Sequence, residues 1–136
     1  MPIFSGRRPR NLGVSEGRLA ACPSSPNCVS SDSADDEHRV EPFEFARDAS
    51  EAWQATRDAV SALPRTRIVT ESADYLHAEC RSALLGFVDD LELHLRAEQG
   101  RIAVRSASRL GYSDLGVNRE RVKRLRAALS RAGAIR

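Results

Sequence analysis

Arginine and hydroxyl side chains are concentrated in one segment of the C-terminal half, between residues 105 and 119. Guanidinium groups recognise carboxylate and phosphate through paired hydrogen bonds, and the free N–H groups at the start of a helix also favour an anion. The segment therefore predicts a polar site for a small anionic ligand or for the carboxylates of a protein partner. The residues expected to line this site are Arg105, Ser106, Ser108, Arg109, Tyr112, Ser113, Asp114, Asn118 and Arg119, together with Asn27, Ser30 and Asp89 from other segments.

The same side chains also fit a structural role. Ser113 or Asp114 can cap a turn, Asn118 can cap the helix that follows, and the arginines can pair with acidic residues of a preceding strand. A catalytic role needs a hydroxyl beside a general base, with an oxyanion donor next to both. Adjacency of Ser113 and Asp114 in the sequence does not supply that geometry. Hydrolytic or transfer chemistry on an anionic substrate therefore stays an alternative to simple binding.

Two consecutive aspartates, Asp89 and Asp90, lie in a predicted strand. Successive side chains of a strand point to opposite faces, so these two cannot form an acid–base pair. Asp89 shares its face with three leucines, and a carboxylate buried there needs a partner, for which an arginine of the 105–119 segment is the candidate. The opposite face carries groups that could bind a metal, but such a pattern is also typical of a solvated sheet face, and we predict no metal and no cofactor. Those groups are Tyr75, His77, Glu79, Asp90, Glu92 and His94.

Two of the three cysteines, Cys22 and Cys28, flank a turn stiffened by two prolines. Their five-residue gap lacks the spacing of a zinc knuckle, so zinc binding would have to recruit Cys80 and His38. A disulfide across this turn is geometrically easy, but a reducing cytoplasm argues against its persistence. We therefore expect a rigid loop with buried free thiols.

Periodicity predicts the elements that position these residues. Asp48 has the form of a helix N-cap with Glu51 three residues later, and Pro64 ends the apolar helical spacing. The segment 88–97 alternates apolar and polar residues, as does 101–107 after the turn at Gly100. The expected order is a short strand at 40–45, a helix at 48–63, strands at 67–72, 75–81, 88–97 and 101–107, and a helix from Asn118 to Gly133.

Consecutive hairpins require an antiparallel sheet, and two amphipathic helices cover its apolar face most simply together. The predicted fold is a two-layer α+β sandwich in β-α-β-β-β-β-α order, with both helices on one face. Residues 1–39 lack sustained periodicity and are rich in Pro, Ser, Gly, Asn and Asp. They predict an irregular arm and Cys/Pro-rich loop preceding a single domain at 40–136.

Bulk composition excludes several classes. The 136 residues are 41% hydrophobic and 29% charged, with a net charge of +2, as in an ordinary globular protein. We expect no integral membrane segment and no secretory signal, which makes the cytoplasm the default location. The C-terminal tail is rich in arginine, but no basic and aromatic residues interleave on a strand, so nucleic acid is not an expected partner.

Three sequence blocks resemble an uncharacterised family catalogued as domain of unknown function 1499, whose members occur in bacteria and in plastid-bearing eukaryotes. The blocks are CPSSPNCVSS at 22–31, SALLGFVDD at 82–90 and RSASRLGYSDLGVNR at 105–119. The likeness covers residues 12–132 and implies no activity, substrate or cofactor. It implies that the three blocks, although separated in the sequence, are features of the same type of domain.

The hypothesis from the residues is a binding module with a pocket for an anion. An accessory subunit that docks on a larger complex is a further alternative, and it would show an exposed apolar patch instead of a pocket.

Overall fold

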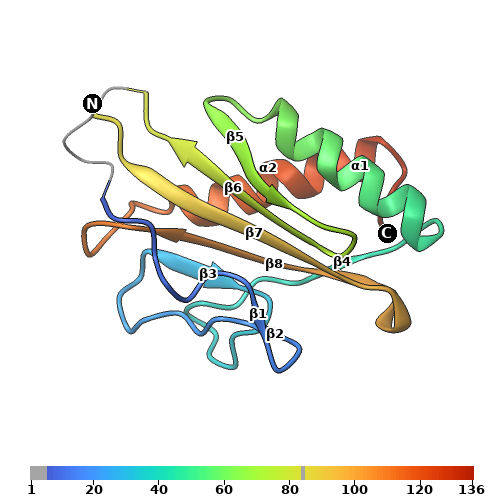
Figure 1. Cartoon of the computed structure of the whole chain (residues 1–136), viewed down its shortest axis with the longest axis horizontal. Coiled ribbons are helices and arrows are strands. Elements are labelled where there is room, and N and C mark those ends of the chain that lie inside the picture. Colours follow the sequence, from blue (N-terminus) through green and yellow to red (C-terminus); the bar gives the residue numbers. More distant parts are fainter. Residues whose placement is uncertain (1–5, 84) are drawn as a thin grey trace.

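The computed structural model describes residues 6–83 and 85–136. It has the expected α+β architecture, in which two helices cover one face of an antiparallel sheet (Figure 1). The strands run in the order β3-β8-β7-β6-β5, and β4 also pairs with β8. Their bounds are β3 (Cys28–Ser30), β4 (Phe43–Glu44), β5 (Thr66–Glu71), β6 (Tyr75–Arg81), β7 (Val88–Arg96) and β8 (Arg101–Ser108), and the helices are α1 (Ala49–Ala62) and α2 (Val117–Arg131).

Local sequence signals account for the limits of α1. The Asp48 carboxylate accepts a hydrogen bond from the Glu51 N–H at 2.8 Å, which satisfies one of the free donors of the first turn. Glu51 does not reach back to complete a capping box, because its carboxylate pairs with Arg47. The helix ends before Leu63, whose extended backbone is the conformation favoured next to a proline.

Alternation along β7 and β8 builds the core. Leu91, Leu93 and Leu95 face the helices, opposite Ser106, Val104 and Ile102 across the ladder. Val122, Leu125 and Leu129 of α2 pack onto this surface, and Ala52 and Val60 of α1 join the same cluster. The period-two pattern in the strands and the 3.6-residue pattern in the helices therefore meet in one apolar layer.

The other face of the sheet is buried, whereas we expected a solvated face. Asp90 is 1% exposed and Glu92 is 0% exposed. The cover consists of residues 6–27, which include the two-stranded ribbon of β1 (Val14–Ser15) and β2 (Arg18–Leu19) (Figure 1). Its backbone contributes to the charged layer, since the Gly13 N–H donates to Glu92 at 2.8 Å.

The first 39 residues thus add three short strands, β1 to β3, to the expected elements. β3 pairs with the second half of β8, with Val29 opposite Ser106. None of the helices in the described ranges has the length and apolar character needed to cross a membrane.

Candidate functional site

The hydroxyls and amides of the 105–119 segment form an internal network centred on Asn118, which is fully buried. Its Oδ1 accepts from the Ser106 hydroxyl at 2.6 Å, and its Nδ2 donates to Ser108 at 2.9 Å and to Asp114 at 2.7 Å. The Nδ2 also donates to the Asn27 carbonyl at 3.2 Å. Both hydroxyls thus bond to this amide; Ser106 also accepts from Arg121 at 3.1 Å, and Ser108 also hydrogen bonds to the Asp89 carboxylate.

We had expected Asn118 to be the N-cap of α2, but the structure shows that it is not. The helix begins one residue earlier, at Val117, after Gly116. Asp114 takes the capping role instead, because its carboxylate accepts from the Gly116 N–H at 2.8 Å and the Asn118 N–H at 3.0 Å. Burial opposes ionisation of Asp114, but these hydrogen bonds outweigh it and lower its pKa.

Asp89 faces the helices as expected, but its partner comes from α2. Arg121 Nη2 lies 2.9 Å from Asp89 Oδ2, so the partner lies outside the 105–119 segment. Helix packing brings this arginine over the strand, which spacing along the sequence does not reveal. Burial raises the pKa of Asp89 despite the neighbouring guanidinium.

Arg105 and Arg109 point to the opposite face of the sheet and belong to a charged layer beneath the arm. Arg109 bridges Glu79 at 2.6 Å and Asp90 at 2.8 Å. Arg105 is 4% exposed, lies 3.4 Å from Glu92 and donates to the Ala21 carbonyl at 3.2 Å. Its buried Nε has no hydrogen-bond partner in the described part of the chain, and Arg105 borders a cavity of about 340 Å³.

His77, Glu79 and Asp90 are the described residues best placed to hold a metal, since their ligand atoms lie within 4.8 Å of one another. Guanidinium groups already occupy this position: Arg109 bridges both carboxylates, and Arg8 also donates to Glu79 at 2.6 Å. Burial opposes ionisation of Asp90, but the hydrogen bonds from Arg109 and His77 lower its pKa. A cation here would have to displace an arginine, so these residues do not fit a metal.

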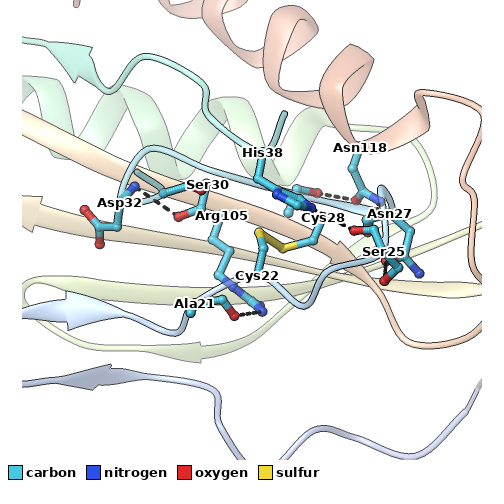
Figure 2. The surroundings of a disulfide bond; sticks show 12 residues. Ala21, Cys22, Ser25, Asn27, Cys28, Ser30, Asp32, His38, Arg105 and Asn118 are labelled. Atoms are coloured by element: carbon cyan, nitrogen blue, oxygen red, sulfur yellow. Dashed lines mark hydrogen bonds between the residues drawn. A yellow bond between two sulfur atoms is a disulfide. The ribbon is translucent and has the colours of Figure 1, made fainter. Parts of the chain in front are cut away.

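Cys22 and Cys28 form a disulfide, with their Cα atoms 5.7 Å apart, so the expectation of free thiols in this loop was wrong. The bond joins the arm to β3, and Arg105 lies next to it (Figure 2). His38 supports the same loop, because its ring nitrogens lie 2.6 Å from Asp35 Oδ2 and 2.9 Å from the Ser25 carbonyl. These two acceptors raise the pKa of His38, since only the imidazolium can donate to both.

The remaining expected site residues are dispersed. Tyr112 is 71% exposed, and Ser113 accepts from the N–H of Leu115. Arg119 donates to two carbonyls of the 37–39 loop, and Ser30 accepts from the Asp32 N–H on the other side of β8. The structure thus divides the set between the two faces of the sheet and does not gather it around one opening.

A different group of arginines surrounds a cleft of about 660 Å³ at the other end of β8. Arg96 forms a bidentate ion pair with Asp32, at 2.7 Å for both contacts, and Arg18 donates to the Asp32 carbonyl. Burial opposes ionisation of Asp32, but the hydrogen bonds from Arg96 and the backbone lower its pKa. Arg18, Arg39, Arg96 and Arg101 line the cleft, against only two carboxylates, Glu16 and Asp32.

Arg101 differs from Arg96, Arg105 and Arg109, which lie on the same face of the sheet. Arg109, Arg105 and Arg96 each lie against a carboxylate. Arg101 forms no ion pair or side-chain hydrogen bond with the described residues, and its Nε is buried without an acceptor. Sequence reasoning missed it because it lies beside the turn at Gly100, outside the segment 105–119 in which arginine and hydroxyl side chains are concentrated. The one available signal was that Arg101, Arg105 and Arg109 follow one another at intervals of four residues. This even spacing places all three on the same face in a strand.

The fold and these clefts define a two-layer α+β protein with a disulfide-tied arm over a charged sheet face. The family model described as protein of unknown function (DUF1499) matches residues 18–129. The chain belongs to this family, as the three sequence blocks had indicated. Neither the curated proteins nor the solved structures contain a significant match to the chain.

Proposed function

We propose that the chain is a binding module that takes a small anionic ligand, a carboxylate or phosphate, in the cleft lined by Arg18, Arg39, Arg96 and Arg101. The observation that carries the proposal is Arg101, whose guanidinium has a buried Nε without an acceptor among the described residues. A buried donor without a partner is costly, and an anionic oxygen would remove that cost.

The neighbouring residues support this assignment. The Asp32 carboxylate is already neutralised by Arg96, so it opposes an anion only weakly. Arg39 donates to the Ser31 and Ser33 carbonyls at 3.4 and 3.5 Å, and its side chain is 41% exposed, so its guanidinium is held beside the cleft and stays accessible to a ligand. A volume of about 660 Å³ is within the range of small-molecule sites.

The test uses the full chain labelled with ¹⁵N, titrated with inorganic phosphate and separately with citrate. We expect the Nε–H signal of Arg101 to shift in a saturable way and the melting temperature to rise. Arg101→Gln removes the charge but keeps a hydrogen-bonding side chain, and it should abolish both effects. Arg124→Gln, an exposed arginine of α2 outside the cleft, is the matched control and should respond as the wild type does.

Two results would refute the proposal. One is the absence of a saturable shift with either anion. The other is an equal response in Arg101→Gln and the wild type, which would make the binding a nonspecific property of the basic surface.

A further inference from the structure

Exposed apolar side chains gather at one end of the molecule. Of the six large hydrophobic residues exposed within the described ranges, five belong to the β6–β7 loop or the segment 110–117. Both loops lie at that end (Figure 1), where the Arg109 N–H donates to the carbonyl of Val88 at the start of β7. The five are Leu85, Leu110, Tyr112, Leu115 and Val117, and Leu115 is 93% exposed.

Leu115 is held in this position by the surrounding loop. Its backbone has a φ of +56°, a left-handed conformation that is unfavourable for any residue with a β carbon. Its N–H donates to the Ser113 hydroxyl, and Asp114 ties the next turn to α2. Asn118 anchors the whole loop to β8 through Ser106. The polar residues of this segment thus fix an aliphatic side chain in solvent, at a cost that a functional contact would explain.

Beside Leu115 lies a groove of about 270 Å³ that is lined by both apolar and basic residues. Leu63, Pro64, Leu115 and Val117 contribute the apolar surface, and Arg65, Arg81, Arg121 and Arg124 contribute the charge, against Glu120 alone. Arg121 is paired with Asp89, and Glu120 lies 3.4 Å from Lys123. The side chains of Arg81 and Arg124 form no ion pair or hydrogen bond with the residues that the structure describes.

We propose that this groove is a docking site for an acidic protein segment that inserts an apolar side chain beside Leu115. The arginines that line the groove specify the charge of the partner, because like charges facing them would be repelled. The apolar residues of the lining supply the contact for an apolar anchor, as is usual at the centre of an interface. The groove is concave, which suits a single inserted side chain better than a flat lipid surface. This site shares no residue with the Arg101 cleft.

The test begins with random 12-residue peptides displayed on phage and selected on the immobilised full chain. We expect enrichment of an apolar residue flanked by Asp or Glu. A fluorescein-labelled synthetic copy of the enriched peptide then gives dissociation constants by anisotropy. Leu115→Gly keeps the left-handed backbone accessible while removing the side chain, and it should weaken binding about tenfold to hundredfold. Arg124→Glu should weaken it as well, and more strongly at low salt.

Control variants separate this groove from the rest of the surface. Val14→Asn removes an exposed apolar side chain elsewhere, and Arg101→Gln removes a cleft arginine; both should bind the peptide as the wild type does. Unchanged circular dichroism and melting temperature in Leu115→Gly would show that folding is intact.

Several outcomes would overturn the docking site. They are enrichment of peptides without acidic residues, equal binding by Leu115→Gly and the wild type, and binding to phosphatidylserine vesicles in place of any peptide. A Leu115-dependent dimer in sedimentation experiments would make a second copy of this chain the occupant, and would overturn the proposal too.

Discussion

Removal of the disulfide by the double substitution Cys22→Ser and Cys28→Ser should lower stability without changing the fold. The two cysteines are six positions apart, so the bond closes a short loop. Loop-closure entropy for such a loop predicts a loss of about 2.4 kcal/mol in the free energy of unfolding. For a chain of this length, that loss corresponds to a decrease of about 8 °C in the melting temperature.

The assay is thermal unfolding of the wild type and the double variant, each with and without dithiothreitol. The reductant should lower the melting temperature of the wild type to that of the variant and leave the variant unchanged. Thiol titration of the unfolded chain without reductant should find only Cys80, since the other two cysteines are bonded. Three reactive thiols in the untreated protein, or equal melting temperatures for wild type and variant, would refute the reasoning.

Two further predictions concern the polar residues that tie the loops to the sheet. Asn118→Ala removes the buried amide that joins α2 to β8 and leaves its buried partners unpaired. The free energy of unfolding, measured with urea, should fall by about 3 kcal/mol. A decrease below about 1 kcal/mol would contradict the structural role of Asn118. The pKa of His38 is raised by the Ser25 carbonyl and Asp35, so its contribution to stability is full below its ordinary pKa of 6.5 and is lost as pH rises through the folded pKa. The wild type should therefore lose stability relative to His38→Gln as pH rises from about 6 to 9, and a constant difference in urea midpoint across that range would count against the assignment.

The elements with local signals could be predicted from the sequence. The Asp48 cap and Pro64 bound α1 because capping and proline geometry depend on neighbouring residues only. Likewise, the alternation in β7 and β8 reflects the pleat of each strand, so the helix-facing side of the sheet was identified correctly.

The candidate site could not be predicted in the same way because it depends on contacts between distant segments. The sequence makes Arg105 and Arg109 candidates for ligand binding. In the fold, however, the arm places a carbonyl against Arg105 and β7 places a carboxylate against Arg109. Arg101 becomes a candidate only because no carboxylate reaches it from the described residues. Pairing of this kind is decided by tertiary packing, and no spacing along the chain encodes it.

The charge of the sheet face beneath the arm determines which side chains would meet solvent if the arm were displaced. In most proteins a segment that covers a sheet buries apolar side chains, and exposure of those side chains promotes aggregation. Here the uncovered strands would present Glu79, Asp90, Glu92 and their arginine partners, all of which water solvates well. Displacement of the residues before Cys22 would therefore expose charged side chains in place of an apolar surface.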